Sequence, residues 1–243
     1  GKGGHGATPQ GTQDAVLKVG LDTGELQWIL GVPDGWNEPW SDHLLAPVQF
    51  VGMGRYADKK DMEWPYHQHA PMITPRGTLL LYDNGNFRSR PFNVSQKPED
   101  SYSRAVEYSI NEITMEVSEV WSHGGPGEGA IYSSFISDAD WLPRTENVLV
   151  THGGILTAQD GRRADGVGLD VRRSARIMEI KRVNTIVPFQ TQGFVPNETV
   201  FEMTIDTNTA TGGWHVYRAE RISSTLHHEG WGNVVTFTAD ENP

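Results

Sequence analysis

The feature that most constrains the fold is a strand-and-turn unit that occurs twice. The segment 74–85 (TPRGTLLLYDNG) recurs in degenerate form at 142–153 (LPRTENVLVTHG). Short apolar runs that are rich in Val, Ile and Tyr and end at Gly, Asp, Asn or Pro predict strands rather than helices. Such runs occupy 15–19, 79–82, 105–110, 148–150, 176–180 and 200–205. We therefore expect an all-β protein built from repeated units.

Each repeated unit supplies about four strands, the number in one blade of a β-propeller. The sequence predicts a flexible lead-in at 1–10 and a partial β-propeller domain at 11–243. Within that domain we expect an outer hairpin at 11–31, blades at about 64–124 and 131–192, and final strands at 198–238. These make roughly three blades, fewer than the four or so that closure needs. We expect either a fragment of a larger propeller, about half of six blades, or completion by a second chain, for example in a homodimer.

Composition excludes several classes of function. The net charge is −11, from 31 acidic and 20 basic residues, which argues against a nucleic-acid partner because phosphate binding needs clustered Lys and Arg. The arginines at 162–163 and 172–176 are expected to be a solvated loop and strand edge. The absence of cysteine excludes thiol chemistry. No apolar run reaches about eighteen residues, so no membrane span is expected.

Two histidines stand out in the segment 64–71 (WPYHQHAP). His67 and His69 alternate with a glutamine, so in an extended strand both would point to the same face. An imidazole at a strand start is a candidate nucleophile or general base. An HxH pair can also bind a metal. Candidate third ligands are His43, Asp83 and His152, and their spacing selects none of them.

The repeat places His69 opposite Ser137 of the next unit. In a propeller the first strand of each blade lines the central channel, so these two residues are predicted to converge on one axial pocket. The alternative is a packed, hydrogen-bonded histidine. The Asp83-Asn-Gly-Asn-Phe-Arg88 segment predicts a turn with a positive φ at its glycine. Arg104 is expected to clamp an anion or, more simply, to pin the blade by hydrogen bonds. Trp28, Trp121 and Trp141 are expected to be buried between blades.

Several stretches, taken in order, carry a resemblance to a known family. They are 13–19, 28–31, 35–37, 44–47, 68–70, 82–85, 102–108, 120–124, 132–133 and 217–218. Together they resemble the C-terminal half of the propeller of the bacterial aryl-sulfate sulfotransferases.

The resemblance implies a six-bladed propeller, usually exported to the periplasm, so the chain is expected to be periplasmic or secreted. The resemblance also implies the family's reaction: transfer of a sulfuryl group from an aryl sulfate to a phenol by a ping-pong route through a sulfohistidine, with no nucleotide or metal cofactor. His69 would be the nucleophile. Tyr217 matches a substrate-pocket tyrosine and Tyr66 would add an aromatic wall, with His67 and Ser137 beside them.

Two positions depart from the family pattern. The family's arginine falls at Gly11, and its pocket threonine falls at Ile136, beside Ser137. Loss of a preorganised cation commonly lowers a rate by orders of magnitude, so this chain alone is expected to be inactive or nearly so. Two alternatives stay open: a propeller module that binds a ligand without turnover, and a metal-dependent hydrolase or lyase that uses His67 and His69.

Overall fold

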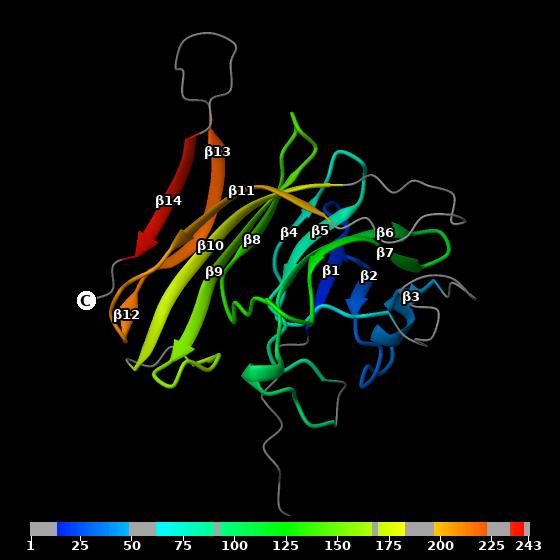
Figure 1. Ribbon diagram of the computed structural model, residues 1–243. Coiled ribbons are helices and arrows are strands. Elements are labelled where there is room, and N and C mark those ends of the chain that lie inside the picture. The colour runs from blue at the N-terminus through cyan, green and yellow to red at the C-terminus, as the bar shows by residue number, and fades with distance from the viewer. Residues whose placement is uncertain are drawn as a thin grey trace, which may run out of the picture.

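The computed structural model describes residues 14–48, 62–89, 93–166, 170–182, 197–222 and 234–240 (Figure 1). Within these ranges the protein is all-β, as the sequence predicted. The helical parts are two short 3₁₀ turns, η1 (Trp40–His43) and η2 (Pro98–Asp100). In the described ranges, no helix has the length and apolarity needed to cross a membrane.

The first large sheet is an antiparallel meander in chain order. Its strands are β4 (His69–Ile73), β5 (Leu79–Asp83), β6 (Arg104–Asn111) and β7 (Glu116–Gly124). The short strand β3 (Ala46–Pro47) adds to its outer edge by pairing in parallel with β7. The turn between β4 and β5 is the Pro-Arg-Gly turn of the first repeat unit.

The second large sheet repeats this plan. Its strands are β8 (Asp138–Trp141), β9 (Val148–Ala158), β10 (Val171–Lys181) and β11 (Glu198–Ile205). β12 (Gly212–Gly213) pairs in parallel with the start of β10. The sequence analysis grouped residue 198 onward with the final strands. In the structure β11 pairs with β10 and is the outer strand of the second sheet, so that grouping is wrong. Residues 183–196, between β10 and β11, are outside the described ranges.

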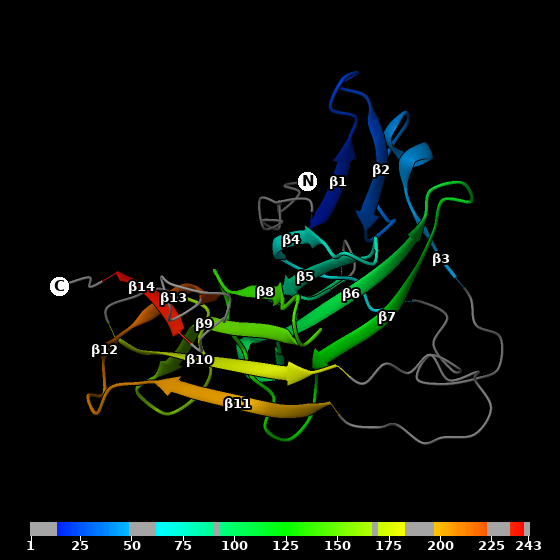
Figure 2. The same cartoon turned by 90° about the horizontal axis from the view of Figure 1, so that it is seen from above.

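Two hairpins flank the large sheets. The first consists of β1 (Ala15–Val19) and β2 (Leu26–Gly31), and the second of β13 (His215–Ile222) and β14 (Val234–Asp240). Figure 2 shows the four sheets following one another along an arc, with β4 and β8 toward its inner side and β7 and β11 outside. The inner strands of successive sheets are therefore neighbours.

Three apolar layers hold neighbouring sheets together. Successive side chains of a strand point to opposite faces, and in β5 Leu79 and Leu81 pack toward the β1–β2 hairpin while Leu80 and Tyr82 pack toward the second sheet. In β9, Val148 and Val150 face the first sheet while Leu149 faces β13. The middle strands are buried on both faces, which is why their sequences read as continuous apolar runs rather than as alternating patterns.

The predicted tryptophan positions are confirmed. Trp28 is buried in the layer between the first hairpin and the first sheet. Trp121 and Trp141 come from different sheets and share the layer between those sheets. Large aromatic side chains therefore join the repeated units to one another.

Gly153, in β9, marks a very close approach between the second sheet and β13. A Cβ on this residue would lie 1.6 Å from the backbone oxygen of Val216. We predict that Gly153→Ala lowers the free energy of unfolding by roughly 3 kcal/mol or more, because backbone must move to relieve the overlap. Urea unfolding followed by tryptophan fluorescence measures this.

Gly166→Ala is the matched control, because a Cβ there meets nothing within 4 Å. It should leave the unfolding midpoint almost unchanged. Equal midpoints for the two variants would contradict the close packing of β13 on β9.

Candidate functional site

His69 opens β4 in a stretch of unusual backbone. His67 has φ of 49° and Ala70 has φ of 51°, both in the left-handed region that non-glycine residues rarely adopt. The pairing of β4 with β5 also shifts register between His69 and Met72. Strained residues and bulges gather where a side chain must be aimed, so this backbone singles out the neighbourhood of His69.

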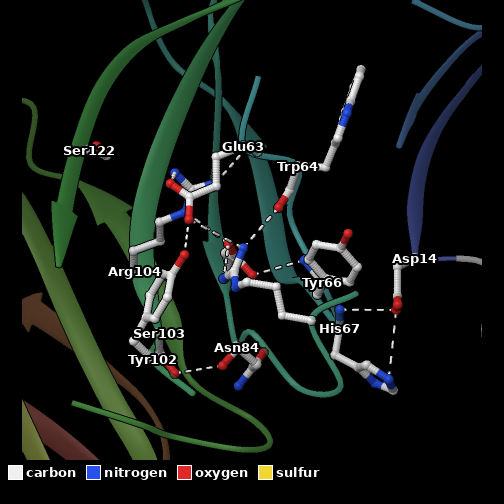
Figure 3. A network of polar contacts seen from close by, with 12 residues as sticks. Asp14, Glu63, Trp64, Tyr66, His67, Asn84, Tyr102, Ser103, Arg104 and Ser122 are labelled. Carbon is white, nitrogen blue, oxygen red and sulfur yellow. Dashed lines mark hydrogen bonds and ion pairs between the residues drawn. The ribbon is translucent and has the colours of Figure 1, made fainter. Parts of the chain in front are cut away.

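The expectation that His67 and His69 share one strand face is wrong. β4 begins only at His69, and the left-handed turn at His67 sends its side chain elsewhere. The backbone N–H of His67 donates to Oδ1 of Asp14 at 3.0 Å, and its Nε2 lies 3.7 Å from the same oxygen (Figure 3). His67 therefore belongs to the contact with the first hairpin.

The other metal-ligand candidates are also engaged elsewhere. Asp83 pairs with two arginines and His152 with Tyr82. In the part of the chain that the structure describes, no group of three His, Asp or Glu side chains is arranged to hold a metal ion.

Asn84 is the direct partner of His69. Its Oδ1 lies 2.6 Å from Nδ1 of His69, and its Nδ2 donates to the carbonyl oxygens of Ser133 at 2.7 Å and Ile136 at 2.9 Å. Asn84 is completely buried. It lies in the turn after β5, where Gly85 has the positive φ of 77° that the Asn-Gly signal predicted. This amide joins the start of β4 to the segment that precedes β8.

Ser137 lies directly before β8, whereas His69 is the first residue of β4, and their predicted convergence on one axial pocket stays a prediction. Ile136 and Ser137 also have left-handed backbones, with φ of 48° and 87°. The Ser137 hydroxyl is turned inward: it lies 2.8 Å from the hydroxyl of Ser133 and accepts from the N–H of Gly153 at 3.0 Å. The repeat thus brings this segment to His69 through Asn84, and the Ser137 hydroxyl itself holds the loop.

Figure 3 shows a buried ionic network around Arg104. Oδ2 of Asp83 accepts from Arg88 at 2.9 Å and from Arg104 at 2.8 Å. Arg104 also reaches Glu63 at 3.3 Å and Glu119 at 2.9 Å. Burial acts to raise the pKa of Asp83, but the two guanidinium charges outweigh it and hold that pKa below its usual value.

This network positions the chain that leads to His69. The other oxygen of Asp83 accepts from the N–H of Tyr66 at 2.8 Å, and Arg88 donates to the carbonyl of Trp64 at 3.1 Å. Arg88 lies over the rings of Tyr66 and Tyr102, at 5.2 Å and 4.4 Å from their centroids. The ring of Tyr66 is thus buried in the core, and its predicted contact with a substrate stays a prediction.

We predict that Arg104→Met lowers the free energy of unfolding by about 3–5 kcal/mol, because it leaves buried carboxylates without their partner. Chemical denaturation measures the loss. The control is Arg162→Met: Arg162 is exposed, pairs with Asp160 and Glu99, and should contribute less than about 1 kcal/mol. Equal effects of the two substitutions would show that the Asp83 network does not anchor the fold.

A second polar group approaches His69 from β8 and β13. Asp138 and Asp140 are hydrogen-bonded to each other, and both lie in the electrostatic field of Arg218. The positive charge of Arg218 acts to lower the pKa of Asp138, and His69 lies close enough to Asp138 to interact with it electrostatically. Tyr217, beside Arg218, is 60% exposed, so the predicted substrate residue is accessible.

Burial raises the pKa of Asp140 to about 7, and the neighbouring charge of Asp138 acts in the same direction. Burial likewise raises the pKa of Asp138. At this pair the folded protein therefore binds more protons than the unfolded chain between about pH 4 and 7, so the contribution of the pair to the free energy of unfolding falls as pH rises through that window.

We predict that Asp140→Asn removes this falling contribution: compared with the wild type, the variant gains stability at pH 8 relative to pH 5, and it is more stable than the wild type at pH 8. Urea midpoints at pH 5 and pH 8 test this. Asp22→Asn, in an exposed turn, is the control and should follow the wild type. If Asp140→Asn has the same dependence of stability on pH as the wild type, the raised pKa values of Asp138 and Asp140 are contradicted.

A buried pair between Tyr82 and His152 lies in the layer between the sheets, and sequence reasoning did not find it. The Tyr82 hydroxyl is 2.6 Å from Nδ1 of His152, and the rings meet edge to face. Burial lowers the pKa of His152 to about 3, aided by the nearby charges of His123 and Arg176. This histidine is therefore neutral at physiological pH and serves packing.

Comparison with known proteins identifies the family. The family described as arylsulfotransferase (ASST) matches residues 11–218, most of the chain. The chain belongs to the arylsulfotransferase family. The resemblance that the sequence analysis drew from scattered stretches is thereby confirmed.

Two curated relatives carry the name arylsulfate sulfotransferase AssT. The protein from Escherichia coli O6:H1 is 32% identical over 147 residues, which cover 58% of this chain and 24% of the relative. The protein from Lelliottia amnigena is 29% identical over 157 residues, which cover 62% of this chain and 26% of the relative. The chain thus spans about a quarter of the length of the relatives that it matches.

Sequence reasoning selected His69 as the candidate nucleophile but did not identify the side chains that surround it. Asn84 was read only as part of a turn, although it stands in one of the stretches that carry the family resemblance. Asp138 and Asp140 gave no signal, and Arg218 stood only in the resemblance stretch 217–218. A strand start and a hairpin separated by many residues meet only after folding. Gly11, where the family has an arginine, lies outside the described residues.

Proposed function

We propose that the protein containing this chain is an aryl-sulfate sulfotransferase and that His69 is its nucleophile. The observation that carries the proposal is the family match over residues 11–218. Three features of the site support it: the strained backbone around His69, its short hydrogen bond to Asn84, and the exposed Tyr217 and neighbouring Arg218 on β13.

The proposed reaction has two half-steps. A lone pair of the His69 imidazole attacks the sulfur of the aryl sulfate, an N–S bond forms, and the S–O bond to the aryl group breaks. The electron pair leaves on the aryl oxygen as phenolate. A second phenol then attacks the same sulfur, the N–S bond breaks, and the acceptor's proton is lost to a base. The imidazole is regenerated, and the net change is exchange of the sulfuryl group between two phenols.

The structure gives two groups that can assist these steps. Arg218 can offset charge on the sulfuryl oxygens, as cationic groups do in phosphoryl transfer. The Asp138–Asp140 pair lies in the same electrostatic environment as His69 and Arg218, and a carboxylate that titrates near neutrality is suited to receive the acceptor's proton. Both roles belong to the proposal.

We extend the proposal to architecture and setting. The two four-stranded meanders and the flanking hairpins are what consecutive blades of a β-propeller would give. The second blade would then extend to β11, beyond the boundary at 192 that the repeat predicted. The partners are a small aryl sulfate and a phenol. Export to the periplasm or secretion follows the family habit stated above and is tested by fractionation.

The second candidate is a propeller module that binds an aryl sulfate without turnover. The observation that favours it is Gly11, which stands where the family has an arginine. The metal-dependent hydrolase or lyase is not proposed further, because His67 and His69 diverge in the structure.

The test is mass spectrometry of the chain after incubation with 4-nitrophenyl sulfate. We expect a sulfuryl-sized mass increase on a peptide from the Trp64–Arg76 region, and its absence in His69→Ala. His43→Ala, at a half-buried histidine on η1, is the control and should keep the adduct. A folded chain that binds the aryl sulfate by calorimetry but forms no adduct would overturn covalent catalysis and favour the binding module.

A further inference from the structure

The contacts of Asn84 determine which nitrogen of His69 carries the proton. The side-chain amide of Asn84 meets two carbonyl oxygens, those of Ser133 at 2.7 Å and Ile136 at 2.9 Å. A carbonyl oxygen only accepts hydrogen bonds. The amide group that faces these two oxygens must therefore be the NH₂, and a flipped amide would place three oxygens against one another.

Because the NH₂ faces the two carbonyls, Oδ1 faces His69, at 2.6 Å from Nδ1. The carbonyl oxygen of His67 also lies 3.2 Å from Nδ1. Both neighbours are acceptors only, so Nδ1 must carry the hydrogen that is shared with them. In the neutral imidazole the lone pair is then on Nε2, the only ring nitrogen left to act as a nucleophile.

The amide of Asn84 is itself held firmly. Asn84 is completely buried, and the backbone oxygen of Asn84 accepts a hydrogen bond from the hydroxyl of Ser103 at 2.7 Å (Figure 3). Ser103 in turn accepts from the N–H of Ser133 at 2.9 Å. The side-chain NH₂ of Asn84 directly, and its backbone oxygen through Ser103, are thus both tied to the loop before β8, and the ring of His69 is fixed relative to both sheets.

We propose that Asn84 is a positioning residue that locks His69 in the Nδ1–H form, so that Nε2 is the atom that receives the sulfuryl group. The statement that Nε2 receives the sulfuryl group rests on the proposed function, whereas the position of the proton on Nδ1 does not. During the transfer the imidazole gains positive charge, and a charged N–H makes a stronger hydrogen bond. Oδ1 of Asn84 therefore stabilises the N-sulfated imidazolium more than the free enzyme.

The left-handed backbones fit this role. His67 and Ala70 bracket His69, and Ile136 and Ser137 follow the loop carbonyl of Ser133. A β-branched residue such as Ile136 with φ of 48° is costly in free energy. The strained residues therefore flank the two segments that Asn84 connects, the start of β4 and the loop before β8. Such strain is expected where the surrounding structure enforces one geometry.

The first experiment uses the unmodified chain without substrate. Nitrogen-15 NMR of the histidine rings, assigned by loss of signals in His69→Gln, reports the protonation of each nitrogen at pH 8. We expect His69 to show an N–H at Nδ1 and a lone-pair nitrogen at Nε2. A proton on Nε2 would overturn the proposal, whether or not the chain transfers sulfuryl groups.

The second experiment compares Asn84→Ala with Asn86→Ala. Both asparagines are buried in the same turn, but within the described residues Oδ1 of Asn86 has no hydrogen-bond partner. In Asn84→Ala only the longer contact to the His67 carbonyl remains, so the Nδ1–H signal should broaden or be lost through exchange. The rate of His69 sulfation by 4-nitrophenyl sulfate should fall about tenfold or more, as when the outer partner of a metal-bound histidine is removed.

Asn86→Ala should keep both the signal and the rate. Unchanged NMR and an unchanged rate in Asn84→Ala would overturn the positioning role. If the wild-type chain shows the Nδ1–H form but is never sulfated, the proposed function is contradicted, and the role of Asn84 in holding the proton on Nδ1 still stands. If Asn84→Ala does not fold, the wild-type spectrum still decides which nitrogen carries the proton.

Discussion

The carboxylate of Asp83 is the interaction on which the rest of the site depends. It ends β5 in a fully buried position and is neutralised by Arg88 and Arg104. A buried charge is costly unless it is paired and hydrogen-bonded, so the two guanidiniums and the Tyr66 N–H must all be in place. That requirement fixes the chain from Trp64 to His67, and with it the start of β4.

The next residue in the chain, Asn84, links the first sheet to the second. Asp83 organises the polar interior of the first sheet, whereas Asn84 reaches across to the loop before β8. Two adjacent side chains therefore connect one buried ionic network to the backbone of the neighbouring sheet. His69 contacts Asn84 directly, whereas Asp83 acts on it through the backbone of Tyr66, three residues earlier in the chain.

The sequence predicted much of the fold because its signals are local. Periodicity, turn residues and the repeated unit gave the strands β5, β6, β9 and β10, and the tryptophans at sheet boundaries. It erred where pairing partners are distant: β11 joins β10 across residues that the repeat did not cover. It also erred at His67, because alternation along a strand says nothing about a left-handed turn just before that strand.

The sequence by itself determined an all-β chain, its family, and His69 as the leading candidate for a nucleophile. The tertiary structure decided what surrounds that histidine. Asn84 meets His69 within the first sheet, in the turn after β5, and the packing of successive sheets brings Asp138 within electrostatic reach of His69 and Arg218. Hydrogen-bond direction is likewise a property of the folded state: two carbonyls of another sheet orient the Asn84 amide, and that orientation sets the proton on His69.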